Sequence, residues 1–247
     1  MNKLIILICF IFSLLSCTKA DERSCLKKSG DSTKLILTPG EFKRIYLKEH
    51  IDYVMVQDTI NYVIIEGGEN LVGFIDCSII DNELVISNKN KCNFLRYKTS
   101  KVTVEIHFKT IENLVFQGTE SLTNRNIWNF NQMNIILKDA GGTMKINNLQ
   151  GSTINLINTH GWGDIYLAGN VNYFRADLDG NGYFDSRNFH VEDSISVISN
   201  SSTISKLNAD NCSLKAQLNA TGDLWYFGNP SNIWKQELGT GRVIDKN

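Results

Sequence analysis

The second half of the chain repeats itself about every twenty residues, and this period limits its fold more than any other feature. Short turn segments mark the repeat, and their last residues follow at steps of 19 to 21 residues: Gly142, Gly163, Gly182, Ser202, Gly222 and Gly241. Two residues beyond each turn stands an apolar residue: Met144, Ile165, Phe184, Ile204, Leu224 and Val243. A unit of two short strands and two turns cannot bury its apolar face alone, so neighbouring copies must stack and share one core. The sequence therefore predicts a β-solenoid with coils of about 20 residues.

In such a solenoid each coil rises by the spacing of hydrogen-bonded strands, about 4.8 Å. Inward residues then form apolar columns, and outward Asn, Ser and Thr residues can form side-chain ladders along the axis. We expect glycine at the corners because a sharp bend often requires a positive φ angle, which glycine adopts without a Cβ clash. The alternative is a row of antiparallel hairpins with glycine-rich turns. We favour the solenoid because the strands recur in pairs at a near-constant period.

The region before the repeat is also predicted to form strands. From Leu35 to Phe116 the apolar residues alternate in short runs, such as Val54-Met55-Val56 and Leu84-Val85-Ile86. Turn residues separate these runs, and no stretch keeps a helical period. We therefore predict an all-β, β-helix-like solenoid with clear repeats from about residue 133, preceded by a strand region that is packed on it or continuous with it.

The N-terminus resembles the export signal of a bacterial lipoprotein. Lys3 precedes an apolar run from Leu4 to Leu15, which is too short to span a bilayer as a helix. The run ends in Leu14-Leu15-Ser16-Cys17, which is similar to a lipobox, where the cysteine becomes the lipidated N-terminal residue. We expect residues 1–16 to be a signal peptide, residues 17–33 to be the lipidated Cys17 and a flexible tether, and residues 34–247 to be a single all-β domain. The alternative is an ordinary signal peptide with an incidental cysteine.

Net charge argues against one broad class of partner. The 25 basic residues nearly balance the 26 acidic residues, which gives a formal net charge of −1 at pH 7. A nucleic-acid-binding protein normally carries an excess of basic residues that neutralises phosphates. We therefore expect no nucleic-acid partner.

Once the cysteines of the signal peptide and the anchor are set aside, four remain: Cys25, Cys77, Cys92 and Cys212. An exported protein can oxidise its cysteines. A hairpin turn at Asp81-Asn82 would place Cys77 opposite Ile86 rather than opposite Cys92, so the sequence leaves open whether any disulfide forms. No C-x-x-C pair and no closely spaced histidine pair is present, so no zinc site is predicted.

Several segments of the chain resemble one bacterial protein family. They are the repeated corners together with Phe42-Lys43-Arg44-Ile45, Glu83-Leu84-Val85-Ile86 and Trp225-Tyr226-Phe227-Gly228-Asn229-Pro230. In this order they are similar to the head domain of auto-transporter adhesins known as the GIN domain, or DUF2807, over about residues 35–245. The corners depart from the family's usual Ser-Gly-Ser-Gly pattern, most clearly at Ser201-Ser202. The resemblance implies an all-β, β-helix-like fold on secreted or lipid-anchored bacterial proteins. It implies no reaction and no catalytic residues.

Motifs of catalysis are missing from the sequence. It contains no Gly-x-Ser-x-Gly elbow, no phosphate-binding loop and no dinucleotide fingerprint. Asp164 and Asp223 occupy equivalent corner positions, but three coils would separate them by about 14 Å, too far to act on one glycosidic bond. We therefore predict no enzyme activity, no catalytic residue and no cofactor. A lyase or hydrolase acting on glycans is the alternative, and it would need a cluster of acids in one groove.

One corner matches the opening of a calcium-binding loop. Asp177, Asp179 and Asn181 follow the pattern D-x-D-x-N-G, which supplies oxygen ligands at alternate positions. Position twelve of such a loop should be glutamate, but here it is Asn188. Because every other repeat turns at the same place, a structural corner explains these residues without a metal, and calcium stays a weak alternative.

Aromatic residues are the remaining candidates for a binding site. The candidates are Trp162, Trp225, Tyr166 and Tyr226. Several aromatic residues of the repeat fall at predicted corner or outward positions, and the phase of Trp162 and Trp225 relative to the apolar column points them outward, where aromatic side chains can stack on sugars or anchor a protein. Packing between neighbouring strands is the competing explanation. We predict a non-enzymatic outer-membrane lipoprotein on the periplasmic or cell-surface face. It would serve as an adhesin or binding module for a glycan or a protein, with its oligomeric state left open.

Overall fold

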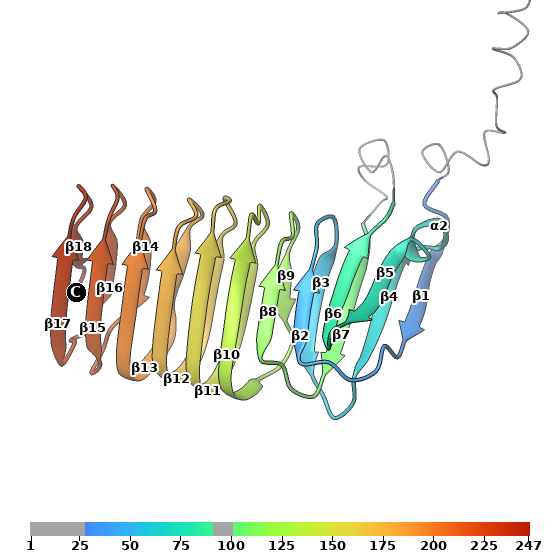
Figure 1. Cartoon of the computed structure of the whole chain (residues 1–247), viewed down its shortest axis with the longest axis horizontal. Helices are drawn as coiled ribbons and strands as arrows, with labels where there is room; N and C mark the ends of the chain where they lie inside the picture. Colours follow the sequence, from blue (N-terminus) through green and yellow to red (C-terminus); the bar gives the residue numbers. More distant parts are fainter. Residues whose placement is uncertain (1–27, 91–100) are drawn as a thin grey trace, which may run out of the picture.

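The computed structural model describes residues 28–90 and 101–247. Its strands form one continuous sheet that coils around a single apolar core (Figure 1). The coils stack side by side along the long axis of the molecule, with the N-terminal strands at one end and the C-terminus at the other. The predicted all-β solenoid is confirmed, and the N-terminal strand region is continuous with it.

Two broad faces of the sheet enclose the core, and we call them face 1 and face 2. Three long strands bend from face 2 to face 1, namely β11 (Met144–Thr159), β12 (Ile165–Leu178) and β13 (Phe184–Ser199). The other strands of face 1, in order across the stack, are β5 (Ile75–Ile80), β6 (Glu83–Asn88), β2 (Arg44–Leu47), β8 (Asn113–Phe116), β10 (Trp128–Lys138), β15 (Ser213–Leu218) and β17 (Asn232–Glu237). The other strands of face 2 are β1 (Ser32–Leu37), β4 (Tyr62–Gly68), β7 (Thr103–Phe108), β3 (Asp52–Gln57), β9 (Leu122–Asn124), β14 (Ser205–Asn208), β16 (Leu224–Phe227) and β18 (Val243–Asp245).

Strand pairing gives the register of the repeat directly. On face 1, Phe174 lies beside Ile195, and Ile195 lies beside Leu214, in parallel strands. These steps are 21 and 19 residues, so the predicted period of about twenty residues is confirmed. The predicted side-chain ladders also form, because Asn155 donates to Asn134 at 2.9 Å and Asn134 donates to Asn113 at 2.7 Å.

Inward side chains of face 2 form a column at one position of each coil from β9 onward: Leu122, Met144, Ile165, Phe184, Ser205, Leu224 and Val243. The sequence prediction placed Ile204 in this column, and that position is wrong. Ser205 pairs with Phe184 and Leu224 and is buried, whereas Ile204 is only partly buried. The corner before β14 (residues 200–204) has the same length as its neighbours, but Thr203 occupies the position that Gly182 and Gly222 hold in the adjacent coils, so the count from Ser202 slips by one.

Corner glycines are required by close stacking and not by a positive φ angle. Among the corner residues that end each turn, none is in the positive-φ region. Gly161, two residues before Gly163, does have a positive φ, of 93°. A Cβ atom on Gly182 would overlap the carbonyl oxygen of Gly163 in the preceding coil, and one on Gly241 would overlap that of Gly222. The expected reason for glycine is therefore corrected, because it is the backbone of the neighbouring coil that excludes a side chain.

The N-terminal coils are not stacked in chain order. Strand β2 lies between β6 and β8, and β3 lies between β7 and β9, all in parallel pairs. The chain thus forms the coil of β2 and β3 first, then a coil on one side of it, and then passes over it to continue on the other side (Figure 1). Antiparallel strands β4 and β1 extend face 2 beyond β7, and a short helix α2 (Glu69–Val72) lies at this end.

A tight turn joins β5 to β6 as predicted. Asp81 and Asn82 both adopt positive φ angles, 48° and 63°, and Cys77 lies directly opposite Ile86. Burial raises the pKa of the Cys77 thiol to about 12. Within the described residues neither Cys77 nor Cys212 forms a disulfide. Cys25, Cys92, the signal peptide and Cys17 lie outside the described residues.

The C-terminal end of the stack is polar. Strand β17 places Lys235 beside Ala216 and Glu237 beside Leu218, so charged residues take over inward positions in the last coil. A polar last coil protects the end of a solenoid from stacking on another apolar end. Among the described residues, no helix is long and apolar enough to cross a membrane.

Candidate ligand-binding sites

Both corner acids singled out in the sequence hold the coils together. The Oδ1 atom of Asp164 accepts a hydrogen bond from the backbone N–H of Tyr183 at 2.9 Å. Asp223 accepts one from the backbone N–H of Arg242 at the same distance. Each bond joins one coil to the next, so these carboxylates have a structural role at equivalent corners.

The residues of the calcium-like motif point to different partners. Asp177 pairs with Arg175 at 3.0 Å, and Asp179 accepts a hydrogen bond from Asn200. Asn181 accepts hydrogen bonds from the backbone N–H and the hydroxyl of Ser202, at 3.1 and 2.8 Å. Across residues 28–90 and 101–247, no group of three or more His, Cys, Asp or Glu side chains is arranged to hold a metal.

An aromatic–basic strip lies on the outward side of face 2, and we define it as Tyr166, Tyr183, Lys206, Trp225 and Lys246. The Lys206 ammonium lies 5.2 Å from the ring centres of both Tyr183 and Trp225. Lys246 approaches the Trp225 ring from the next coil, at 4.3 Å, and Tyr166 packs 5.8 Å from Tyr183. A cation above the face of an aromatic ring is attracted to that ring, by about 0.5–1 kcal/mol at exposed sites. The strip therefore presents positive charge and aromatic surface together.

A salt bridge borders the strip. Arg187 donates to Asp185 at 2.8 Å and lies 5.6 Å from the ring centre of Phe227. Tyr183 also donates to Asp185, at 3.2 Å. Desolvation raises the pKa of Asp185, but the hydrogen bonds and charge of Arg187 outweigh it and hold the pKa below its usual value. Asp185 is thus neutralised within the protein, while Lys206 and Lys246 are free of any ion pair among the described residues.

The four aromatic candidates from the sequence do not form one site. Tyr166 and Trp225 belong to the strip, whereas Trp162 lies on the corner between β11 and β12 with 73% of its surface exposed. Tyr226 is half-buried and packs against the core, and burial raises the pKa of its phenol. Lys206 was missed in the sequence, although it stands 19 residues before Trp225 and hence in the same outward column.

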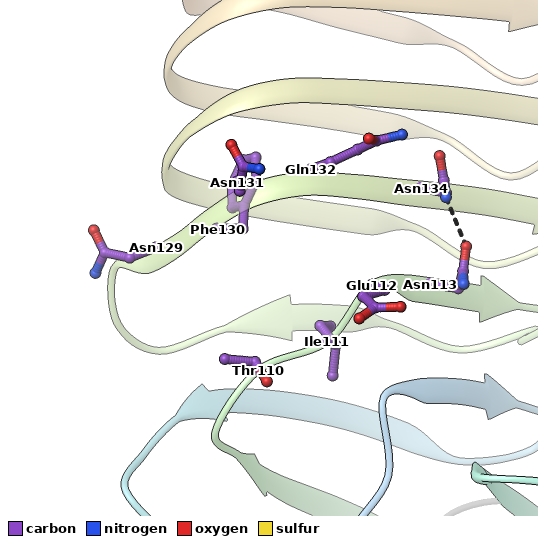
Figure 2. Close-up of a pocket in the computed structure, with 9 residues that line it drawn as sticks. All are labelled: Thr110, Ile111, Glu112, Asn113, Asn129, Phe130, Asn131, Gln132 and Asn134. Atoms are coloured by element: carbon purple, nitrogen blue, oxygen red, sulfur yellow. Dashed lines mark hydrogen bonds between the residues drawn. The ribbon is translucent and has the colours of Figure 1, made fainter.

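A hollow of about 510 Å³ opens at the junction between the N-terminal coils and the regular repeat (Figure 2). Its lining residues come from the segment that leads into β8 and from β10: Thr110, Ile111, Glu112, Asn113, Asn129, Phe130, Asn131, Gln132 and Asn134. We call it the β8–β10 hollow. Reasoning from sequence missed it, although the clustering of asparagines between residues 124 and 134 was a signal.

The passage of the chain over the β2–β3 coil creates this hollow. Strand β10 pairs with β8 only from Asn134 onward, whereas its earlier residues pair with β11 alone within the described part of the chain. The Gln57 side chain bridges the segment before β8 and the start of β10, which form the two walls of the hollow. Its side-chain amide donates to the carbonyl groups of Lys109 and Asn129, at 3.0 and 2.9 Å, and accepts from the Asn129 N–H at 2.6 Å.

A partly buried acid–histidine network lies on face 2 at β7. His107 contacts Asp58 at 2.9 Å and Glu105 at 2.8 Å, and the ring of Tyr62 stacks on it at 3.8 Å. Arg125 binds both oxygens of Glu105, at 2.8 and 2.5 Å. Because these groups bond to one another, the network stabilises the fold and leaves neither the imidazole nor Glu105 directed at a substrate.

The geometry defines a β-solenoid protein with two outward surfaces suited to ligands and no assembled catalytic group among its described residues. The chain belongs to the family described as "Putative auto-transporter adhesin, head GIN domain" (DUF2807), which matches residues 41–230. The resemblance seen in the sequence is confirmed. Membership supports an adhesin-like, non-enzymatic role at the cell envelope or surface.

Solved structures share this fold. A putative adhesin from Bacteroides fragilis is 20% identical with a TM-score of 0.79, covering 87% of this chain and 97% of that one. A putative lipid binding protein from Parabacteroides distasonis is 17% identical with a TM-score of 0.60, covering 87% and 98%. A putative adhesin from the same species is 19% identical with a TM-score of 0.53, covering 88% and 98%. No curated protein matches the chain.

Proposed function

We propose that this protein is a non-enzymatic, lipid-anchored adhesin of the outer membrane that binds an acidic glycan or protein through the aromatic–basic strip. The observation that carries the proposal is Lys206, held between the rings of Tyr183 and Trp225 on the outward side of face 2. Its ammonium forms no ion pair with any described residue, so it is free to meet a carboxylate or sulfate of a ligand.

Lipid attachment would orient the solenoid on the membrane. The proposed anchor, Cys17, precedes β1 by about fifteen residues, and β1 lies at the N-terminal end of the stack. A polar tether of this kind would leave both faces of the sheet accessible to a partner. The aromatic–basic strip, which spans β12 to β18, would then lie toward the end away from the membrane.

Fractionation of cells tests the anchor. The wild-type protein should be found with the membrane, and the Cys17→Ser variant should be released in soluble form. A Cys25→Ser variant serves as the matched control, because it removes a neighbouring cysteine and should stay with the membrane. Retention of the Cys17→Ser protein in the membrane would contradict lipidation at this residue.

Binding to an array of sialylated and sulfated glycans tests the strip. The Trp225→Ala and Lys206→Met variants should bind these glycans less well, because a few aromatic and charged anchors dominate such interfaces. Trp162→Ala removes an exposed indole on a corner outside the strip, and it therefore measures how much that corner contributes to glycan binding. Equal binding by the wild type and all three variants would refute the proposal that the strip binds the ligand. Turnover of any glycan that is abolished by substitution of an acidic residue, in a variant that keeps the wild-type melting temperature, would instead establish the enzyme alternative.

A further inference from the structure

The β8–β10 hollow has the size and construction of a ligand site. Ligand pockets usually occupy about 300–1,000 Å³, and this hollow measures about 510 Å³. Its walls are the segment that leads into β8 and strand β10, and the Gln57 side chain bridges them by three hydrogen bonds, to Lys109 and to Asn129. The walls are therefore held by backbone pairing within the sheet and by the three bonds of the Gln57 side chain.

Amide side chains dominate its lining. Asn113 and Asn134 are bonded to each other, as Figure 2 shows. The side-chain amides of Asn129, Asn131 and Gln132 make no hydrogen bond to any other described residue, and all three side chains are exposed. Each amide both donates and accepts, so it can satisfy a hydroxyl group in either orientation.

Charge in the hollow selects against anions. Glu112 is the single charged side chain of the lining, and Lys43 pairs with it at 2.7 Å. The nearby Lys109 pairs with Glu41 at 2.9 Å. A phosphate, sulfate or carboxylate would therefore meet a carboxylate and find no unpaired cation among the lining residues.

An apolar surface completes the hollow. Phe130 is partly buried against the core, and its exposed part borders the hollow together with Ile111. Aromatic rings of this kind pack against the C–H face of a sugar ring, while amides bind its hydroxyl groups.

We infer that the β8–β10 hollow binds an uncharged sugar unit of a glycan, a second site distinct from the aromatic–basic strip. Asn129, Asn131 and Gln132 bind its hydroxyl groups, and Phe130 packs against its apolar face. The inference rests on the proposed function as an adhesin, and it adds neutral saccharides to the ligands of that adhesin.

Saturation-transfer NMR with cellobiose, maltose, lactose and chitobiose tests the site, each at millimolar concentration with the full folded domain. At least one of these neutral disaccharides should receive magnetisation from the wild-type protein. The Asn131→Ala/Gln132→Ala double variant should bind it about tenfold less tightly, because it loses about two hydrogen bonds. Asn155→Ala, which removes a ladder amide one coil away, should bind like wild type with a comparable melting temperature.

The outcomes separate this inference from the proposed function. If none of the four disaccharides binds, or if the double variant binds as tightly as wild type, the neutral-sugar site is wrong. Loss of acidic-glycan binding in Trp225→Ala with neutral binding intact would support both sites as independent. If acidic glycans bind in a manner that depends on Trp225 and no neutral disaccharide binds, the proposed adhesin function is supported and the neutral-sugar site in the hollow is wrong.

Discussion

The carboxylate of Asp164 accepts a hydrogen bond of 2.9 Å from the backbone N–H of Tyr183, which lies 19 residues later in the chain. The same bond recurs between Asp223 and Arg242. Asp52 forms a related bond across the rearranged N-terminal coils, where its carboxylate accepts from the N–H of Ser121 at 3.2 Å. A carboxylate at a corner thus fixes the spacing of two coils at both ends of the solenoid.

We predict that Asp164→Ala lowers the free energy of unfolding by about 1 kcal/mol, because the Tyr183 N–H loses its acceptor. For a domain of this size the melting temperature should fall by about 2–4 °C. Asp164→Asn keeps the acceptor oxygen and is the matched control. Equal melting temperatures for the alanine and asparagine variants would show that the bond contributes nothing.

The corrected register of face 2 gives a second prediction. Ser205→Asp would place a charge between Phe184 and Leu224 in the core and should cost about 3–5 kcal/mol. Ile204→Asp, at the partly buried neighbouring position, should cost about 1 kcal/mol. Urea unfolding distinguishes them. If Ile204→Asp lowers the free energy of unfolding more than Ser205→Asp does, then Ile204 is the inward residue, as the sequence predicted.

Substitution of corner glycines should depend on coil stacking. Gly182→Ala would push a methyl group into the carbonyl of Gly163, and we expect a loss of about 1–3 kcal/mol. Gly73→Ala is the control, because its φ is −69° and no atom lies within 4 Å of the added Cβ. That control should be neutral or stabilised by about 0.4–1 kcal/mol, as thermal melts of both variants would reveal.

Low pH should reduce the stability of the folded protein, in part through protonation of Asp185. Its pKa in the folded protein lies below the ordinary value of 3.8, so its contribution is complete above that pH and is lost as the pH falls through the folded pKa. Because the Arg187 side of the pair is about half exposed to solvent, we expect this contribution to stay below about 1 kcal/mol. Between pH 5 and pH 2 (roughly the span over which such a group titrates), Asp185→Asn should lose less stability than wild type. Parallel acid-melting curves for the two proteins would contradict this assignment.

Periodicity was sufficient to predict the solenoid because each apolar column repeats along the chain. Leu156 and Ala176, for example, occupy the same inward position in successive coils. The hairpin at Asp81-Asn82 was also predictable, since a local turn decides its register. At Ser202 the prediction slipped because that corner carries Thr203 where its neighbours carry glycine, so nothing in the serine-rich segment marks the equivalent position.

The hollow and the strip could not be predicted in the same way. The hollow depends on where the chain crosses the β2–β3 coil, and that crossing is set by contacts such as Asp52 with Ser121, 69 residues apart. No local pattern records such a pairing. The strip depends on Lys206 meeting rings from two other coils, and only the exact register places them together.

The position of β2 between β6 and β8 also sets the order in which the protein can be built. As the chain emerges during synthesis or export, β2 and β3 follow directly after β1, but every parallel partner that they have among the described residues is made later. Pairing over such long separations is slow because the chain entropy is lost before the contacts form. Once β9 has emerged, however, each following coil adds to a finished edge through contacts of about twenty residues. We therefore expect a nascent chain to wait in a protease-sensitive form until β9 appears, and then to fold by rapid sequential growth toward the C-terminus.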